Sequence, residues 1–300
     1  MKILLTGSSG FLGSHLARNF LEDGHQVIAL KRKTSSLHRL AGIEGQLKFY
    51  DIEELDLLKL FEEHESIDAV VHTATCYGRE EESVSEVFKA NTAFPLRLLE
   101  AAISFNTDIF VNTDTYFNTD KLSSYYLSNY ILSKKQFSDW GKLISLEKKI
   151  CFINIRLEHM YGPGDNKSKF VSWIVDQCLQ NTPEIKLTPG DQLRDFIHID
   201  DVVSAYSILI FNSEKFKKGY LEVGLGSGKT ISVKNFVETV HYLSKSKAKL
   251  EFSALPYRDQ EIMYSQADIQ QLKLLGWDCK VNFKEGINTM IKYNRNIHSE

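Results

Sequence analysis

The chain has 300 residues, of which 43% are hydrophobic and 25% charged, a composition typical of a globular protein with a sizeable core. The net charge of −3 and the pI near 6.3 exclude a strong basic field, so we expect neither nucleic acid nor a membrane as a partner. The apolar run before Gly7 is too short for a signal peptide, no transmembrane stretch follows, and the four cysteines are widely spaced; we therefore expect a cytoplasmic location, reduced thiols and no metal site.

Strand and helix patterns alternate through the first half of the chain. Short apolar runs predict strands at residues 2–6, 26–31, 47–50, 68–73, 108–113 and 149–156. Helical spacing of apolar residues predicts helices between them, at residues 11–21, 51–64, 83–104 and 123–147. This order predicts an α/β fold with a doubly wound parallel sheet of the Rossmann type, because right-handed crossovers place helices on both faces.

TGSSGFLG at residues 6–13 lies between the first predicted strand and the first predicted helix. Gly7 permits a tight turn, Gly10 lets a pyrophosphate approach the backbone, and Gly13 permits close packing of the helix. The position directly after an N-terminal strand favours a dinucleotide site over a turn with incidental glycines. The residues of this loop predicted to bind the dinucleotide are Gly7, Ser9, Gly10, Phe11, Leu12 and Gly13.

The second predicted strand ends in LKRKTSS, which places Lys31, Arg32 and Lys33 at the corner beside the adenosine ribose. NAD requires a carboxylate there for the ribose 2′-hydroxyl, whereas the 2′-phosphate of NADP requires a cation. A solvated basic turn is the alternative interpretation. Because this corner carries no acid in the sequence, we predict NADP(H) as the cofactor.

Residues 123–135, SSYYLSNYILSKK, contain three tyrosines and two lysines. Four-residue spacing places Tyr126, Tyr130 and Lys134 on one face of a helix. About one tyrosine with a lysine four places later is expected by chance in this composition, so the pair alone proves nothing. The glycine loop and the basic corner that precede it favour an active-site pair.

The alternation loosens after YGPGD at residues 161–165. The later patterns predict a helix at 169–179, a strand near 185–187, a strand followed by a helix within 194–210, a helix from Val233, a strand at 249–253 and two closing helices. We predict a dinucleotide-binding Rossmann domain at 1–165, to which 194–223 returns. Residues 166–193 and 224–300 then form a smaller interleaved substrate lobe.

GxxGxxG at 7–13, VNTDTYF followed by YxxxK, RLEHMYGPGD and RDFIHIDDV together resemble the extended short-chain dehydrogenase/reductases, the NAD-dependent epimerase/dehydratase family. The resemblance implies three catalytic residues. Thr113 would hold the carbonyl oxygen and Tyr130 would donate a proton. Lys134, together with a bound oxidised nicotinamide, would lower the pKa of Tyr130, and it would also bond the nicotinamide ribose. The other cofactor contacts that it implies are Asp51, Ile52, His72, Thr73, Ala74 and Asn91.

The same resemblance implies a sugar-nucleotide site in the substrate lobe. Arg194 and Arg258 would clamp a diphosphate, and the strand that begins at Arg194 would return to the main sheet. Thr115 replaces a glutamate that family dehydratases use as a base, which favours keto reduction over dehydration. For His159, a histidine satisfied by the backbone is an equally weighted alternative. The predicted substrate contacts are Tyr77, Asp114, Thr115, Glu158, His159, Lys169, Phe170, Arg194 and Arg258.

TATCYGREEES, LTPGDQLRDFIHIDDV and RDQEIMYSQADIQQLKLLGW resemble the CDP-sugar 4-ketoreductases of that family, which reduce the C4 ketone of a CDP-4-keto-3,6-dideoxyhexose with NADPH in O-antigen sugar synthesis. The resemblance also implies a homodimer through helices at 84–105 and 123–147. The nucleotide base and the C4 stereochemistry stay open. Alternatives are a nucleotide-sugar epimerase that holds NAD and a non-catalytic dinucleotide sensor.

GLGSGKT at 224–230 is preceded by Val223 where a P-loop needs glycine, so no ATP site is predicted.

Overall fold

The computed structural model describes residues 1–79, 81–118 and 126–297. The chain forms two compact units. Unit 1 contains Met1–Leu122, Tyr126–Leu157 and Val203–Gly224, and unit 2 contains most of the remainder, Glu158–Val202 and Leu225–Glu300. No helix in the described part of the chain is long and apolar enough to cross a membrane.

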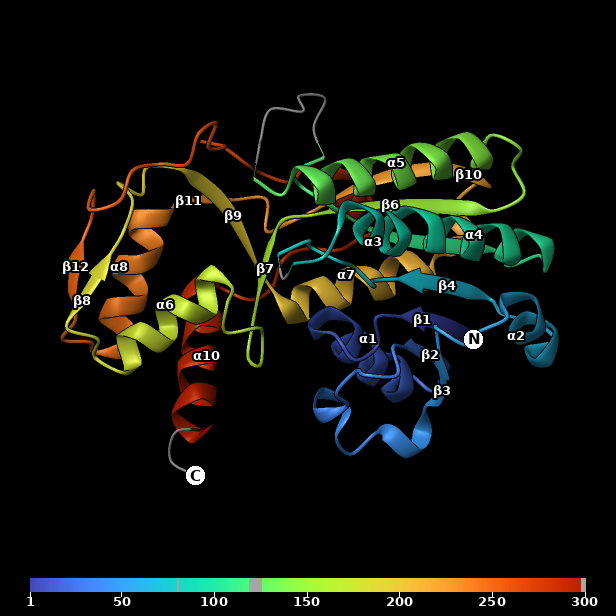
Figure 1. Ribbon diagram of the computed structural model, residues 1–300, viewed down its shortest axis with the longest axis horizontal. Helices are drawn as coiled ribbons and strands as arrows, with labels where there is room; N and C mark the ends of the chain where they lie inside the picture. Colours follow the sequence, from blue (N-terminus) through green and yellow to red (C-terminus); the bar gives the residue numbers. More distant parts are fainter. Residues whose placement is uncertain (80, 119–125, 298–300) are drawn as a thin grey trace. The chain divides into compact units, whose positions relative to one another are not determined.

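Unit 1 is built on a seven-stranded sheet with the order β10-β6-β5-β4-β1-β2-β3 (Figure 1). β1 pairs in parallel with β2 and β4, and the pairs β2–β3, β4–β5 and β5–β6 are also parallel. The predicted doubly wound α/β fold is confirmed. The strands are β1 (Lys2–Thr6), β2 (Gln26–Lys31), β3 (Lys48–Asp51), β4 (Ala69–His72), β5 (Ile109–Thr115), β6 (Cys151–Leu157) and β10 (Gly219–Leu225).

Helices cover both faces of this sheet, since its central strands are apolar on both sides. On one face α2 (Leu57–His64), α4 (Phe94–Ser104) and α5 (Ser128–Ser145) share a core with the strands. On the other face lie α1 (Phe11–Glu22) and the part of α7 (Ile199–Phe211) that belongs to unit 1. The rings of Phe20 and Phe211 join these two helices at 6.2 Å.

The predicted helix at 83–104 is interrupted by a wider turn. It consists of α3 (Val84–Phe88), a π-helical turn at Lys89–Ala93, and α4. Ser83 and Glu86 form a capping box that starts α3. Pro95, in the first turn of α4, lacks an N–H, so the preceding turn cannot keep regular α-helical hydrogen bonds. Asn91 lies in the middle of that turn.

The tyrosine-rich helix begins later than the spacing predicted. α5 starts at Ser128, directly after Leu127, whose φ of 59° is left-handed. Tyr126 therefore precedes the helix, and it does not share a helical face with Tyr130 and Lys134, which lie one turn apart within α5. The predicted start at residues 123–125 lies outside the described residues.

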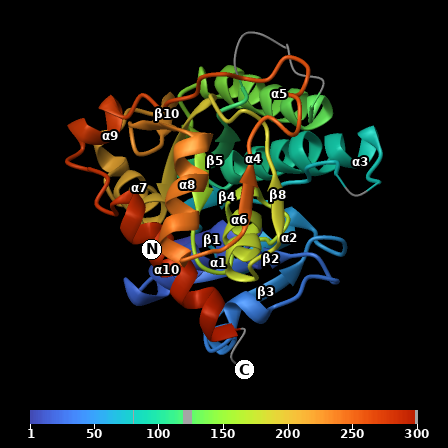
Figure 2. The ribbon, with the colours of Figure 1, turned by 90° about the vertical axis from the view of Figure 1, so that its left-hand side faces the viewer.

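Unit 2 combines two small sheets with packed helices. The three-stranded sheet has the order β11-β9-β7, and β12 pairs in parallel with β8. Figure 2 shows α6, α8 and α10 side by side, and their apolar faces share one core with Phe196 and Ile185. The elements are β7 (His159–Tyr161), α6 (Phe170–Leu179), β8 (Glu184–Lys186), β9 (Leu193–His198), β11 (Thr230–Ser232), α8 (Val233–Ser244), β12 (Lys249–Glu251), α9 (Gln270–Leu274) and α10 (Phe283–Ile297).

The strand that begins near Arg194 does not return to the main sheet, so that prediction is wrong. β9 pairs in parallel with β7 and antiparallel with β11, which fills both of its edges. The seventh strand of the main sheet is β10 instead. The contacts accordingly divide the chain after Leu157 and after Val202 rather than at residues 165 and 194.

Candidate active site

The turn between β1 and α1 brings three backbone segments into close contact. Gly7 has a φ of 67°, and a Cβ there would lie 2.7 Å from the Ala74 nitrogen. A Cβ on Gly13 would lie 2.1 Å from the Gly7 oxygen, so only glycine permits this approach of helix to turn. Gly10 precedes α1 and has no side chain to cap its first turn. The turn therefore has the backbone geometry that binds an anion at a helix N-terminus.

The carboxyl end of β4 is tied to β1 beside this turn. The Thr6 hydroxyl accepts hydrogen bonds from the backbone nitrogens of Thr73 and Ala74, each at 3.2 Å. The Thr73 hydroxyl donates to the Thr6 carbonyl at 2.7 Å. The backbone of Thr73 and Ala74 thus lies against Gly7, where these residues were predicted to border the cofactor. His72 is fully buried.

Asn91, from the π-helical turn, braces the loop that follows β4. Its Oδ1 accepts from the Cys76 nitrogen at 2.8 Å, and its Nδ2 donates to the Cys76 carbonyl at 2.7 Å. The same Nδ2 donates to the Ser133 hydroxyl of α5 at 3.0 Å. Asn91 thus joins the loop after β4 to α5 from a wider turn of the kind that is frequent at functional sites.

The basic corner after β2 is partly neutralised by β3. Lys31 forms an ion pair with Asp51, its partner in the strand register, and Lys33 pairs with Glu54 at 3.3 Å. Arg32 is exposed and has no acidic partner among the described residues. A carboxylate therefore does stand at this corner, supplied by the neighbouring strand, although β2 itself carries none. The predicted adenine contacts at this strand end are Asp51 and Ile52.

Tyr130 lies in the first turn of α5 with a side chain that is 6% exposed. Its ring lies 4.9 Å from the ring of Tyr77, and its phenol has a side-chain hydrogen bond with Thr115. Burial raises the pKa of Tyr130 well above 10, and the Tyr77 phenol raises it further, while the bond with Thr115 lowers it. Burial has this effect because a phenolate is poorly solvated here. Tyr130 is therefore protonated at neutral pH.

The Thr113 side chain has a hydrogen-bond partner on α7. The Thr113 hydroxyl shares a hydrogen bond of 2.7 Å with the hydroxyl of Tyr206, a buried residue of α7. Thr115, two residues later on β5, is the threonine that contacts the Tyr130 phenol. Thr115 is therefore a second candidate, beside the predicted Thr113, for the threonine that acts with Tyr130.

Lys134 lies one helical turn after Tyr130 and is 2% exposed. Burial lowers the pKa of Lys134 to about 8, and the carboxylate of Asp114 opposes this shift. Asp114 is 3% exposed, and burial raises its pKa. Its oxygens accept from Asn118, Asn154 and the Thr115 nitrogen at 2.6, 2.9 and 2.8 Å. The carboxylate predicted to touch substrate is therefore buried and bonded to three donors of its own unit.

Sequence reasoning missed Asn154, Asn112 and Arg79. The two asparagines stand in the middle of otherwise apolar strands, and a buried polar residue in such a run was the available signal. The Arg79 guanidinium lies 4.8 Å from the ring of Tyr77 and 5.8 Å from that of Tyr126, within the range of cation–π interactions. Tyr77, a predicted substrate contact, is thus packed between Arg79 and Tyr130.

Unit 2 contains the remaining predicted substrate residues. Glu158 is buried and accepts a hydrogen bond from the Ser265 hydroxyl at 2.6 Å, while His159 Nδ1 lies 3.3 Å from its other oxygen. His159 therefore has a side-chain partner and is not satisfied by the backbone alone. Lys169 pairs with Asp165 at 3.0 Å. The neighbouring Phe170 is exposed at the start of α6.

Arg194 and Arg258 differ in their surroundings. Arg194 is 5% exposed, and its guanidinium pairs with Glu261 at 2.7 Å and donates to the Leu193 carbonyl at 3.0 Å. Arg258 is exposed. The charge of Arg194 is thus already balanced by Glu261 within unit 2.

The loop 224–230 closes around an aspartate of its own unit. The Asp195 carboxylate accepts from the nitrogens of Ser227, Gly228 and Ala267 at 2.7, 3.0 and 3.2 Å. A Cβ on Gly226 would lie 2.4 Å from an Asp195 oxygen. The backbone N–H groups that a phosphate would need here are bound to Asp195. The glycines of this loop therefore allow the backbone to approach Asp195, and no nucleotide is needed to explain them.

The family model described as the NAD dependent epimerase/dehydratase family matches residues 3–224. CDP-abequose synthase from Salmonella muenchen is 35% identical to the chain over 291 residues, which cover 97% of this chain and 97% of that protein. The sequence likeness therefore extends through both units.

Two solved structures share the fold. UDP-glucose 4-epimerase from Thermotoga maritima with UDP-glucose has a TM-score of 0.85 at 22% identity, covering 99% of this chain and 100% of that chain. UDP-glucuronic acid 4-epimerase from Bacillus cereus, in complex with UDP-glucuronic acid and NAD, has a TM-score of 0.83 at 24% identity with the same coverage. At these identities the likeness establishes the shared architecture.

Proposed function

The chain belongs to the NAD-dependent epimerase/dehydratase family, as its motifs predicted, and we propose that it is an NADPH-dependent reductase of a nucleotide-activated 4-keto-deoxyhexose. The favoured substrate is CDP-4-keto-3,6-dideoxyglucose, reduced at C4 to CDP-abequose or CDP-paratose for surface polysaccharide synthesis. A cytoplasmic location is part of this proposal.

The observation that carries the proposal is the group formed by Tyr130, Thr115 and Lys134. Tyr130 is a buried phenol that stays protonated at neutral pH, which suits a general acid in a reduction. Thr115 contacts its oxygen, and the charge of Lys134 lies one turn away on α5. A threonine at 115 also replaces the glutamate base that a dehydratase would need.

The residues present fit a bound dinucleotide. The β1–α1 turn would hold its diphosphate, because a Cβ at Gly7 or Gly13 would collide with the backbone and the start of α1 has no side-chain cap. Arg32 would hold a 2′-phosphate. Lys31 and Lys33 at the same corner are paired with carboxylates, whereas Arg32 has no acidic partner among the described residues. When bound, the reduced nicotinamide supplies the hydride.

The side chains of this chain then perform the proton transfer. As the C4 carbon gains the hydride, Tyr130 donates its phenolic proton to the ketone oxygen, which becomes the product hydroxyl. The Thr115 hydroxyl and the Lys134 charge stabilise the phenolate that remains until it regains a proton from water. Burial of Tyr130 and Lys134 lowers the local dielectric, so each of these interactions is stronger than it would be in water.

The CDP-sugar follows from the relative of 35% identity, which is named as a CDP-abequose synthase. Its coverage of 97% includes unit 2, where the predicted sugar-nucleotide contacts lie. Within that unit we propose exposed Arg258 as a diphosphate ligand and Arg194 as a second one after release from Glu261.

The test is an assay of NADPH oxidation with CDP-, dTDP- and GDP-activated 4-keto-deoxyhexoses, followed by NMR of the product at C4. We expect turnover with the CDP-sugar and its loss in Tyr130→Phe, with NADPH affinity nearly unchanged. Purified protein that carries stoichiometric NAD and interconverts C4 epimers without NADPH oxidation would establish the epimerase alternative instead. Tight NADPH binding without turnover of any of these sugars would establish the non-catalytic alternative.

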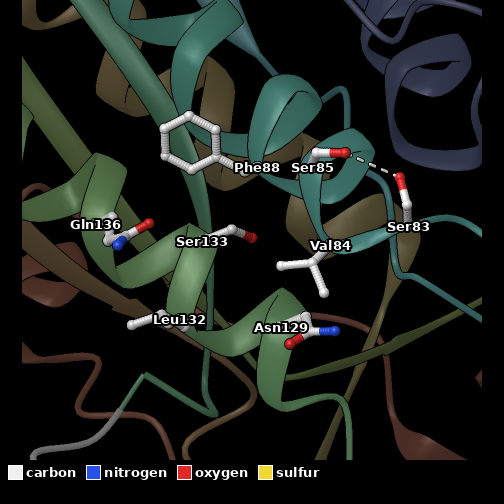
Figure 3. A pocket seen from close by; sticks show the side chains of 8 residues that line it. All are labelled: Ser83, Val84, Ser85, Phe88, Asn129, Leu132, Ser133 and Gln136. Atoms are coloured by element: carbon white, nitrogen blue, oxygen red, sulfur yellow. Dashed lines mark hydrogen bonds between the residues drawn. The ribbon is translucent and has the colours of Figure 1, made fainter.

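We also propose a homodimer through the surface formed by α3 and α5. A groove of about 580 Å³ runs between these helices (Figure 3), with Val84 and Phe88 from α3 and Leu132 from α5 on its walls. All three side chains are exposed, as are Trp140 and Leu143 farther along α5. Several exposed apolar side chains on neighbouring helices of a globular protein are typical of an interaction site.

A further inference from the structure

A row of polar side chains crosses the face of the main sheet that packs against α5. His72 of β4 and Asn154 of β6 both lie in register with Asn112 of β5, and all three are fully buried. Asn112 Nδ2 donates to Asn154 Oδ1 at 2.7 Å, and Asn154 Nδ2 donates to Asp114 Oδ2 at 2.9 Å. Burying polar side chains in the core of a sheet costs free energy unless each of them is hydrogen-bonded. This row is hydrogen-bonded from Asn112 to Asp114, where it ends.

The chain of amides has a direction, and Asp114 sets it. A carboxylate only accepts hydrogen bonds, so Asn154 must present its NH₂ group to Asp114 and its carbonyl to Asn112. Asn118 donates to the same carboxylate oxygen, and the Thr115 nitrogen donates to the other. Three donors on one carboxylate favour its ionised form against the cost of burial. The row therefore ends in a buried carboxyl group whose hydrogen bonds oppose the rise in pKa that burial causes.

Asp114 ends this row on β5, against which α5 packs, and Lys134 is buried on α5; the charge of Asp114 acts on Lys134. His72, from β4, is neutral, because burial lowers its pKa well below 6.5. The Thr6 hydroxyl accepts from two backbone nitrogens and so donates its proton to His72 Nδ1 at 2.8 Å, leaving the Nε2–H tautomer. Tyr130, on α5 itself, is protonated at neutral pH. The carboxylate of Asp114, from β5, remains to stabilise the ammonium.

We propose that Asp114 is a positioning residue that keeps the buried Lys134 ammonium charged, and that Asn154 and Asn118 keep Asp114 ionised for this purpose. The proposal rests on the proposed function only in placing Lys134 in the active site. It assigns to Asp114 a role toward a side chain of the protein rather than toward the substrate.

The experiment measures the pKa of Lys134 in cofactor-free protein by NMR titration of ¹³Cε-labelled lysine, with the resonance assigned from Lys134→Met. In Asp114→Asn we expect this pKa to fall by about one unit, because an opposite charge nearby is removed. Asparagine preserves the shape, and the amides of Asn154 and Asn112 can turn over to keep the row bonded. The control is Glu222→Gln, which removes an exposed carboxylate and should leave the Lys134 pKa unchanged.

The reciprocal measurement covers the case in which Asp114→Asn does not fold. Coupling between two sites is mutual, so the pKa of Asp114, followed by ¹³Cγ-aspartate NMR, should rise in Lys134→Met by a similar amount. Lys135→Met, one residue along α5, should not change it. Unchanged pKa values in both experiments would overturn the proposal, because a merely structural Asp114 would alter stability alone.

A third measurement links the coupling to catalysis. In Asp114→Asn the alkaline limb of kcat for keto reduction should move to lower pH by the same interval as the Lys134 pKa. An alkaline limb that stays in place while the Lys134 pKa falls would overturn the role in catalysis. The NMR result does not depend on the substrate, so failure of the reductase assay and failure of this inference are distinguishable.

Discussion

At the scale of single residues, two threonines of β5 compete for one role. Thr115 contacts the Tyr130 phenol, whereas Thr113 is bonded to Tyr206. Thr115→Val should lower kcat for keto reduction by about 100-fold, the typical cost of losing one donor at a developing charge, with NADPH affinity nearly unchanged. Thr113→Val should lower kcat by less than about tenfold. Steady-state kinetics and NADPH binding check this, and the opposite ranking would return the role to Thr113.

Arg32 decides the cofactor in our proposal. Its guanidinium has no acidic partner among the described residues, whereas Lys33 is paired with Glu54. Arg32→Ala should weaken NADPH binding by about 10- to 100-fold and leave NADH binding nearly unchanged, since only NADPH carries the 2′-phosphate. Lys33→Ala is the matched control and should have a smaller effect. Fluorescence titration measures both affinities; an equal loss for the two cofactors would refute the 2′-phosphate assignment and favour Asp51 as a ribose ligand.

Lys134 links activity to stability. Its pKa of about 8 in the folded protein is below the ordinary 10.5, so the unfolded chain binds more protons between these values and stability rises as the pH rises through them. At pH 7 the buried charge is costly. Lys134→Met should therefore raise the free energy of unfolding at pH 7 by about 3 kcal/mol at most. The loss of the favourable interaction between Lys134 and Asp114 makes this gain smaller. The same substitution should abolish reduction.

The measurement for Lys134 is urea denaturation at pH 7 and above pH 10.5. The gain should disappear at the higher pH, where the lysine is neutral in both states. Lys135→Met, on the same helix, is the control and should show no such pH dependence. A loss of stability in Lys134→Met at pH 7 would mean that the pair with Asp114 outweighs the burial cost.

At the scale of elements, the packing of α1 against the β1–α1 turn depends on one missing side chain. A Cβ on Gly13 would lie 2.1 Å from the Gly7 oxygen and 2.7 Å from its carbonyl carbon, both backbone atoms. Gly13→Ala should displace the start of α1, lower the free energy of unfolding by about 1–3 kcal/mol and abolish dinucleotide binding. Urea denaturation and NADPH titration test this. Gly45→Ala, at a position with open space, is the control; equal behaviour of the two variants would contradict the packing argument.

Some elements of the fold can be predicted from local sequence patterns alone. The glycine turn and the alternation of strands and helices depend on neighbouring residues, and both appear as predicted. The π-helical turn at Lys89–Ala93 was not predicted, because apolar spacing does not distinguish one wider turn within a helix. Pro95 is the residue in the sequence that accounts for this turn, and the turn contains Asn91.

At the scale of the whole molecule, the exposed apolar side chains of α3 and α5 predict self-association. Purified protein should be a dimer by size-exclusion chromatography with light scattering, and Leu132→Glu combined with Leu143→Glu should convert it to a monomer, because two charges would be buried at the interface. Leu58→Glu, an equally exposed leucine on α2, should leave the dimer intact. A wild-type monomer, or a dimer that survives the double substitution, would place the interface elsewhere.

The sequence by itself determined the family, the parallel sheet, the dinucleotide turn and the Tyr130–Lys134 pair, because each depends on residue types at short, fixed spacing. Only the tertiary structure decided which groups face each other across strands. Strand register places Asp51 beside Lys31, Asn154 beside Asn112, and β9 in a sheet of unit 2. The packing of α5 against the sheet lets Thr115 act on the pKa of Tyr130 and Asp114 on that of Lys134. These pairings are set by packing between distant segments and by burial, which raises the pKa of a phenol and lowers that of an ammonium.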